Sequence, residues 1–373
     1  MKKQKIIISC GGTGGHIFPA LEIAKSLQKK DSNLDILFVG AFGRMEMKKV
    51  PKAVFSIRGI WIQGIYRNSI IKNILFPLKL IISLIQSFFI LLHHNPVAVI
   101  GTGGFASFPV LYTASWFRIK TYIQEQNCHP GLANKILSKY VNRVFVAHDG
   151  MKMFFPEHKT LNLGNPVRKS LKINSVSKKN SREFFGLKEN TFTILVLGGS
   201  LGAPAINKLV QDLFFLPNVF SKNFQLIWQT GEMQNQNDFR DCSNVFETKF
   251  IDRMDLAYHA SDIVISRAGA IAIAELCFLS KPSILIPSPH VTANHQTINA
   301  EYLKKNNAAF LISEKEIQNQ KGRSNSKKLV DFIEFLMANQ NKREEMGHNA
   351  NQLFKYESAD EIVNIVLKEC HTN

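Results

Sequence analysis

The stretch KIIISCGGTGGHIFPALEIAKSLQKK, residues 5–30, joins a short apolar run to a glycine-rich turn and then to a helical pattern. Four of the five residues from Gly11 to Gly15 are glycine, and apolar residues at helical spacing follow from about Phe18. A strand, a tight turn and a helix form the first half of a βαβ unit. Glycines at this turn let the backbone approach a ligand closely; a tight turn without a ligand is the alternative.

The same pattern recurs along the chain. Near-continuous apolar runs that end in glycine or polar residues are typical of parallel strands covered on both faces. One series comprises residues 5–9, 34–40, 96–104, 120–127 and 142–148, and a second comprises 192–200, 224–230, 244–251, 261–269 and 282–289. Residues 161–187 are polar and contain Gly-Asn-Pro, which predicts a linker and a surface segment. The 373 residues thus predict an α/β protein with two doubly wound, Rossmann-like parallel-sheet domains that face each other across a cleft.

The composition is that of a folded globular protein, with 45% hydrophobic and 20% charged residues. Five cysteines lie far apart with no metal-ligand spacing, which suits a reducing cytosol, and we expect no metal and no cofactor. The first twelve residues reach glycine before the apolar region of a cleavable signal peptide could develop. The net charge of +17 suggests nucleic acid, but no nucleic-acid-binding motif accompanies it, so we expect no nucleic-acid partner.

The most hydrophobic segment, residues 70–94, follows a basic region. Residues 44–79 contain eight basic residues and one acidic residue. The uninterrupted apolar part, residues 80–92, is shorter than the ~20 residues that a bilayer span needs, so a transmembrane helix is not expected. Two alternatives remain. The segment is either a buried crossover helix or an apolar surface that binds anionic lipid with the help of Lys72 and Lys79.

The glycine turns do not match the common nucleotide-binding motifs. A dinucleotide-binding G-x-G-x-x-G would need glycine where Ile17 stands, and no P-loop sequence occurs. In the second series, LGGSLGAPAIN (197–207) and SRAGAIAIAEL (266–276) each run from a strand through glycine into a helix, whose first N–H groups can face an anion. The Ser200 hydroxyl could donate to phosphate, and Glu275 could accept from ribose, unless it is a solvated helix residue. Two such helix starts in one domain indicate a nucleoside diphosphate.

Seven short segments, in this order, resemble the MurG family, the peripheral-membrane N-acetylglucosaminyltransferases of bacterial peptidoglycan synthesis. They are GGTGGH (11–16), GTGGFASFP (101–109), EQNCHPGLANK (125–135), GNPVR (164–168), GGSLGA (198–203), SRAGAIAIAE (266–275) and HQTINA (295–300). GAFGRMEMKKVP (40–51) is also similar to an element of that family. Each segment alone is a weak signal, but seven in the same order are specific.

The resemblance implies a GT-B enzyme. It implies an N-terminal, membrane-facing acceptor domain at 1–164, onto which a C-terminal helix within 353–373 packs, and a UDP-GlcNAc-binding domain at 165–352. The implied reaction inverts the anomeric centre and moves GlcNAc from UDP-GlcNAc to the 4-hydroxyl of MurNAc in lipid I, the undecaprenyl-linked acceptor, to form lipid II. The implied location is peripheral, on the anionic cytoplasmic face of the bacterial inner membrane.

The resemblance also implies roles for individual residues. The backbone of Thr13, Gly14 and Gly15 approaches the donor diphosphate and sugar. Arg168 and Ser200 bind phosphate. The other implied donor-site residues are Asn127 on the GlcNAc hydroxyls, Ile251 on uracil through its backbone, Ala270, Ile271, Ala272, Ile273 and Ala274 along the helix start, Glu275 on the ribose, and Gln296 on the sugar.

One histidine and one glutamate are candidates for catalysis. His16 at the end of the glycine turn is the preferred general base, because imidazole titrates near neutral pH, and a hydrogen-bonding role towards the donor is its alternative. Glu125 is the competing base, unless it orients Asn127 or the acceptor. The chain contains no Asp-x-Asp, so we expect helix N-termini, Ser200 and Arg168 to stabilise the leaving diphosphate without a metal.

Two positions depart from the family pattern. Phe105 stands where the family usually has tyrosine, and Ala272 where it usually has threonine. These differences affect details of acceptor and donor contacts.

Four other functions remain as alternatives to the transferase. They are another UDP-sugar transferase with a lipid acceptor, a UDP-GlcNAc epimerase, a basic nucleic-acid-binding protein, and an α/β protein without activity.

Overall fold

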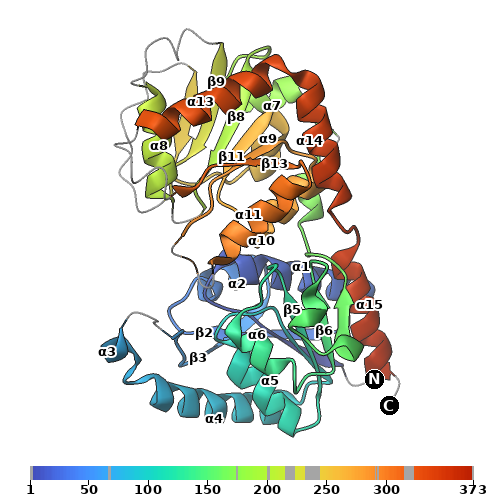
Figure 1. The fold of residues 1–373 in the computed structure, drawn as a ribbon. Helices are drawn as coiled ribbons and strands as arrows, with labels where there is room; N and C mark the ends of the chain where they lie inside the picture. The colour runs from blue at the N-terminus through green and yellow to red at the C-terminus, as the bar shows by residue number, and fades with distance from the viewer. Residues whose placement is uncertain are drawn as a thin grey trace. The chain divides into compact units, whose positions relative to one another are not determined.

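The computed structural model describes residues 3–65, 69–173, 175–199, 202–214, 223–231, 244–289, 291, 294–314 and 323–371. The chain forms two compact units (Figure 1). Unit 1 comprises residues 1–167 and 355–373, and unit 2 comprises residues 168–354. The boundaries expected from the sequence, after residues 164 and 352, lie a few residues earlier in the chain.

Unit 1 is built on a parallel sheet with the order β3-β2-β1-β4-β5-β6-β7. Ser9 of β1 pairs with Val39 of β2 on one side and with Gly101 of β4 on the other, so the strand order reverses between β1 and β4. The strands are β1 (Lys5–Ser9), β2 (Asp35–Ala41), β3 (Ser56–Ile60), β4 (Ala98–Gly101), β5 (Lys120–Glu125), β6 (Arg143–Val146) and β7 (Thr160–Asn162).

Helices cover both faces of this sheet, which explains why β1 is apolar throughout. Ile6 and Ile8 pack into one hydrophobic cluster and Ile7 into another, because successive side chains of a strand point to opposite faces. The first cluster also contains residues of α1 and α15, which pack against each other. The helices are α1 (Gly14–Lys30), α2 (Glu46–Lys52), α3 (Ile70–Asn73), α4 (Phe76–His94), α5 (Ser107–Trp116), α6 (Leu132–Leu137) and α15 (Ser358–His371).

Unit 2 repeats this arrangement with the strand order β10-β9-β8-β11-β12-β13. Its strands are β8 (Phe192–Leu197), β9 (Phe224–Gln229), β10 (Val245–Thr248), β11 (Ile263–Ser266), β12 (Ser283–Leu285) and β13 (Ala309–Leu311). Its helices are α7 (Lys178–Phe184), α8 (Pro204–Phe214), α9 (Met254–Ala260), α10 (Ala270–Phe278), α11 (His295–Lys305), α13 (Arg323–Ala338) and α14 (Gln340–Gln352). The prediction of two parallel-sheet α/β domains is confirmed.

Every apolar run predicted as a strand contains one, but three strands of the described residues were not predicted. β3, β7 and β13 are short or lie at a sheet edge, where a strand needs fewer apolar residues. The predicted linker and surface segment, residues 161–187, begins within β7 and contains α7.

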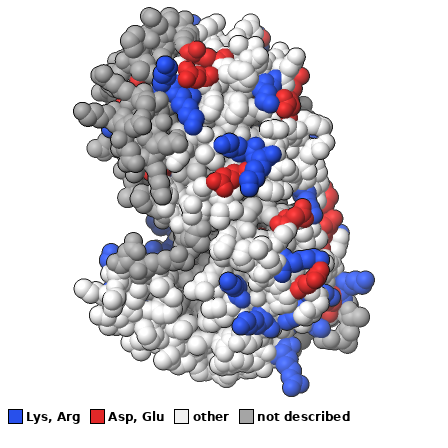
Figure 2. All heavy atoms as spheres, viewed as in Figure 1, with Lys and Arg blue, Asp and Glu red and all other residues white. Residues whose placement is uncertain are grey.

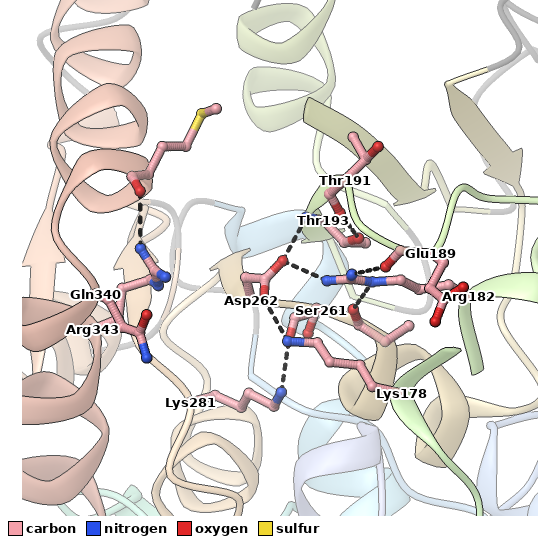
Figure 3. A network of polar contacts seen from close by, with 12 residues as sticks. Lys178, Arg182, Glu189, Thr191, Thr193, Ser261, Asp262, Lys281, Gln340 and Arg343 are labelled. Atoms are coloured by element: carbon pink, nitrogen blue, oxygen red, sulfur yellow. Dashed lines mark hydrogen bonds and ion pairs between the residues drawn. The ribbon is translucent and has the colours of Figure 1, made fainter. Parts of the chain in front are cut away.

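A polar network holds α7 to the amino ends of β8 and β11 (Figure 3). Asp262 accepts from Lys178, from Arg182 at 2.7 Å and from the backbone N–H of Thr193 at 2.7 Å. Lys281 donates to the Ser261 carbonyl at 2.7 Å. This network joins the polar segment after β7 to the amino ends of the central strands, which lie opposite the ends that carry the glycine turns.

Candidate active site

The glycine turns of unit 1 follow two adjacent strands, β1 and β4. The chain leaves β1 for α1 and β2 on one side of the sheet, and leaves β4 for α5 and β5 on the other. Ligands of open α/β sheets bind where the strand order reverses in this way. The Thr102 hydroxyl donates to the His16 carbonyl at 2.8 Å, which ties the second turn to the start of α1.

The glycines of the two turns are explained by different contacts. A Cβ on Gly11 would lie 2.8 Å from Oε1 of Glu46, and one on Gly104 would lie 2.1 Å from the Gly11 carbonyl oxygen. Packing within the chain therefore excludes side chains there. A Cβ on Gly15 would meet, among the described residues, only Oγ1 of Thr13 at 3.6 Å, an ordinary contact. Gly15 thus leaves space at the start of α1 that the chain itself does not fill.

His16 lies in the first turn of α1 with a defined ring orientation. Its Nδ1 is 3.0 Å from the Gly11 carbonyl oxygen and 3.1 Å from Oγ1 of Thr13. A carbonyl oxygen only accepts, so Nδ1 carries the proton in the neutral ring and Nε2 is the basic nitrogen. This tautomer suits a general base that acts through Nε2.

Glu125, at the end of β5, is buried and fully engaged. One carboxylate oxygen accepts from the backbone and side-chain amides of Asn127, both at 3.1 Å. The other accepts from the Gly131 backbone at 3.0 Å and from the Asn134 side chain at 2.9 Å. Four hydrogen bonds occupy its acceptor sites, so the geometry favours Glu125 as the residue that orients Asn127 rather than as a base.

Phe105 packs beneath the first glycine turn. Its ring atoms lie 3.0 Å from the position of a Cβ on Gly12 and 3.1 Å from that of one on Gly64. The Arg44 guanidinium carbon lies 5.8 Å from the ring centroid, within cation–π range. The ring at position 105 therefore supports the turn whether or not it carries a hydroxyl.

The glycine turns of unit 2 likewise follow adjacent strands, β8 and β11, at which the strand order reverses. A Cβ on Gly198 would lie 2.6 Å from the Ala203 nitrogen, and one on Gly202 would lie 2.3 Å from the Thr230 carbonyl oxygen. Gly199, with φ +89°, meets no described atom within 4 Å. Ser200, the predicted phosphate ligand between them, lies outside the described residues.

Gln229, at the end of β9, links this turn to the predicted uracil contact. Its side-chain nitrogen donates to the Gly199 carbonyl at 3.0 Å, and its oxygen accepts from the Ile251 N–H at 2.9 Å. Because the Ile251 N–H is already bonded to Gln229, only the Ile251 carbonyl oxygen is left to contact the uracil base.

The second turn of unit 2 leads directly into α10. Gly269 caps the helix, and the position of its Cβ meets no atom of the described chain within 4 Å. The side chains of Ile271 and Ile273 are buried, as are Ala270 and Ala274, while Ala272 is half-buried. The predicted donor-site residues 270–274 therefore present their backbone at the helix start, where amides favour anions.

The structure brings Glu275 and Arg168 together. Nη2 of Arg168 lies 2.8 Å from Oε1 of Glu275, and the Tyr258 hydroxyl donates to Oε2 at 3.0 Å. Burial, followed by the nearby Glu275 charge, raises the pKa of Tyr258 well above its ordinary value, so the phenol remains a donor. Glu275 is 6% exposed, which excludes the alternative of a solvated helix residue.

Gln296, in the first turn of α11, accepts from the Ser288 backbone N–H at 2.9 Å through its side-chain oxygen. Its amide nitrogen is the group left to donate to a sugar hydroxyl. Three residues further along α11, Asn299 donates to the Ala268 carbonyl at 3.3 Å, which links α11 to the turn before α10.

Three residues that shape these turns were not predicted from the sequence as site residues: Glu46, Gln229 and Tyr258. Glu46 carried two signals, since it is the single acid in the basic region of residues 44–79 and lies in the family-like segment of residues 40–51. Gln229 and Tyr258 carried none, because a glutamine at a strand end and a tyrosine in a helix are common. Their partners are distant in the sequence.

The described residues hold no group of three or more metal-ligating side chains. Burial raises the pKa of the thiols of Cys128 and Cys277 to about 12, so neither is a thiolate nucleophile near neutral pH.

A separate apolar surface lies on α3 and α4 of unit 1. By length and composition, residues 70–94 could span a bilayer. The expectation that this segment is too short to span, which was based on residues 80–92 alone, is therefore not met. However, α4 connects β3 and β4 of one sheet and buries Ser83, Ser87, Ile90 and Leu91 as a single stripe against the unit.

The opposite stripe of α4 is exposed, with Ile81, Ile85, Phe89 and Leu92 each more than half exposed. In Figure 2 the edge of unit 1 that carries α3 and α4 shows few charged side chains. The buried-helix alternative is therefore wrong, and the segment is a surface helix with an apolar outer face.

Comparison with known proteins matches both units to one family. Residues 6–146 match the glycosyltransferase family 28 N-terminal domain, and residues 193–362 match the glycosyltransferase family 28 C-terminal domain. A Flavobacterium psychrophilum protein is 43% identical over 373 residues, covering 99% of this chain and 98% of its own length. A Parabacteroides distasonis protein is 40% identical, covering 99% of each chain. Both are named UDP-N-acetylglucosamine–N-acetylmuramyl-(pentapeptide) pyrophosphoryl-undecaprenol N-acetylglucosamine transferase.

Solved structures share the fold at lower identity. Acinetobacter baumannii MurG superposes with a TM-score of 0.73 at 24% identity, covering 98% of this chain and all of that one. A Neisseria meningitidis UDP-GlcNAc 2-epimerase bound to UDP-GlcNAc superposes with a TM-score of 0.66 at 17% identity, with 98% and 100% coverage. The fold alone therefore does not separate a transferase from an epimerase.

Proposed function

This chain belongs to the MurG family of glycosyltransferase family 28, and on that premise we propose that it forms lipid II in peptidoglycan synthesis. It transfers GlcNAc from UDP-GlcNAc to the 4-hydroxyl of MurNAc in lipid I, with inversion. The observation that carries this function is identity of 40–43% along essentially the whole length of relatives named for that reaction.

Unit 2 is proposed to bind the donor. The start of α10 and the turn after β8 supply backbone N–H groups for the diphosphate, as at other helix N-termini. Glu275 accepts from the ribose hydroxyls. Arg168 and Tyr258 fix the position of its carboxylate for this role. Arg168, held at Glu275, adds positive charge for the phosphates, and Gln296 donates to a sugar hydroxyl. Asn127, a residue of unit 1, is proposed to donate to the GlcNAc hydroxyls.

Unit 1 is proposed to supply the catalytic base. Nε2 of His16 accepts the proton of the MurNAc 4-hydroxyl as its oxygen attacks the anomeric carbon and UDP leaves. Thr13, Gly14 and Gly15 offer backbone close to the reacting sugar, and the space at Gly15 permits that approach. Glu125 orients Asn127 and the loop that follows β5.

The proposed location is the cytoplasmic face of the inner membrane, where the lipid acceptor is held. The exposed apolar stripe of α4, with Lys72 and Lys79 beside it, provides the two signals that reversible attachment requires: apolar area and positive charge. The acceptor then diffuses to the enzyme within the membrane surface.

A single assay tests the reaction. Purified protein is incubated with UDP-GlcNAc and a short-chain lipid I analogue, and UDP release is measured with and without the acceptor. Acceptor-dependent release with a disaccharide product supports the transferase. Conversion of UDP-GlcNAc to its C2 epimer without an acceptor would establish the epimerase alternative instead.

A further inference from the structure

Glu46, the first residue of α2, is a fully buried carboxylate at the glycine turn of unit 1. Its Oε1 accepts from the Ala41 N–H at 3.0 Å and its Oε2 from the Gly12 N–H at 3.1 Å. No Lys or Arg forms an ion pair with it among the residues that the structure describes. Backbone amides and the N-terminus of α2 therefore stabilise this charge.

Two glycines leave the space that the Glu46 side chain occupies. A Cβ on Gly11 would lie 2.8 Å from Oε1, and one on Gly40 would lie 2.5 Å from Cγ. Gly11 follows β1, and Gly40 lies in β2. Glycine at both positions is thus explained by the carboxylate, and the carboxylate is locked in place by its surroundings.

The peptide group between Gly11 and Gly12 connects Glu46 to His16. Its N–H, on Gly12, donates to Glu46 at 3.1 Å, and its C=O, on Gly11, accepts from Nδ1 of His16 at 3.0 Å. The two groups point in opposite directions across a planar trans peptide. Because Glu46 fixes the direction of the Gly12 N–H, it also fixes the direction of the Gly11 carbonyl, and this carbonyl selects the His16 tautomer.

We propose that Glu46 is a positioning residue that holds the Gly11–Gly12 peptide so that His16 carries its proton on Nδ1 and acts through Nε2. The importance of this for catalysis rests on the proposed role of His16 as base. The tautomer itself is a property of the chain and does not depend on that role.

The test is Glu46→Gln, which keeps the shape of the side chain. The glutamine amide faces either the Gly12 N–H or the Ala41 N–H with a donor instead of an acceptor, so the side chain no longer holds both backbone groups and the Gly11–Gly12 peptide loses a fixed partner. In the parent, ¹⁵N NMR of the imidazole should show His16 protonated at Nδ1, with His16→Gln used for assignment. In Glu46→Gln, the Nε2-protonated form should appear, and the acid limb of the pH profile of kcat should move.

Kinetics provide a second readout. We expect kcat to fall about 10- to 100-fold, the scale of a small misplacement of a catalytic group, while the Kd for UDP stays within about 2-fold because unit 2 is unchanged. Glu46→Asp retains the charge with a shorter side chain, so it should recover part of both the Nδ1 tautomer and kcat.

Glu369→Gln is the matched control in unit 1. Glu369 lies on α15 and also accepts two hydrogen bonds, from Tyr122 at 3.1 Å and from Arg143 at 2.8 Å. It should lower stability without altering the His16 signals or kcat. A folded Glu46→Gln with parental His16 signals and kcat overturns the proposal. If Glu46→Gln does not fold, Glu46→Asp decides: a parental tautomer and kcat would overturn the proposal, and an intermediate change in both would support it.

The two levels of the proposal can fail separately. A parent protein without acceptor-dependent UDP release contradicts the proposed function. The NMR comparison of the parent with Glu46→Gln still decides whether Glu46 sets the His16 tautomer.

Discussion

Arg168 and Glu275, 107 residues apart in the chain, form an ion pair with 2.8 Å between Nη2 and Oε1. The sequence assigned them to different parts of a nucleotide, the phosphate and the ribose. In the structure they form one group with Tyr258, which holds the second carboxylate oxygen. In the proposed function, recognition of the ribose and of the phosphate charge would therefore be coupled through the Glu275 carboxylate.

Replacing Glu275 with alanine should weaken UDP binding by about 1.5–3 kcal/mol, the range for hydrogen bonds to a charged group. It should also reduce the preference for UDP over 2′-deoxy-UDP, because the ribose hydroxyls lose their acceptor. Titration calorimetry with both nucleotides measures this. Unchanged UDP affinity would contradict the ribose assignment.

Tyr258→Phe is the matched variant for that experiment. It removes one hydroxyl and keeps the ring, so Glu275 remains paired with Arg168. We expect it to weaken UDP less than Glu275→Ala and to lower the free energy of unfolding by about 1.5–3 kcal/mol. Urea denaturation beside the calorimetry separates the two effects.

His16→Ala should lower kcat by roughly 10²- to 10⁴-fold, the usual contribution of general-base catalysis, with UDP affinity nearly preserved. The single-turnover rate at saturating donor is the appropriate measurement. A variant that keeps its rate and loses donor affinity would show that His16 binds the donor.

Activity should persist in EDTA, because the positive potential for the leaving diphosphate is assigned to helix starts and Arg168. The assay is run with protein that has been dialysed against EDTA, with and without added Mg²⁺. Strict dependence on Mg²⁺ would require a metal in the mechanism.

Reversing the charge of Lys72 and Lys79 should reduce binding to anionic vesicles by about 30-fold or more, at ~1 kcal/mol for each lysine near the surface. Turnover of a water-soluble acceptor analogue should stay unchanged. Lys29→Glu with Lys30→Glu, at the exposed end of α1, applies the same charge change away from α4. Equal loss in both double variants would point to net charge rather than to this surface.

Lys281 should make the stability of unit 2 depend on pH. Burial, and then the nearby Lys178 charge, lower the pKa of Lys281 from 10.5 to about 7. Between these values the unfolded chain binds the proton and the folded chain does not, so stability rises with pH in that window. Urea denaturation from pH 7 to 10 should show a steeper rise for the parent than for Lys281→Met, and equal slopes would contradict the shift.

The glycine turns were predictable from the sequence because strand, turn and helix are adjacent in the chain, as for β1 and α1. The contacts that shape those turns were not, because they join residues far apart. Glu46 reaches Gly12 across 34 positions, and Gln229 reaches Ile251 across 22. Composition also could not decide whether α4 is buried, because an apolar helix looks alike in a core and on a surface.

The return of α15 to unit 1 has a consequence for synthesis on the ribosome. Ile362, Val363 and Val366 belong to the same hydrophobic cluster as Ile6 and Ile8. Unit 2 is contiguous, so its strands and helices are all available once residue 354 has emerged. Unit 1 is begun first yet acquires the core residues of α15 only after all of unit 2 has been synthesised. A nascent chain stalled before α15 would therefore expose that part of the core to chaperones.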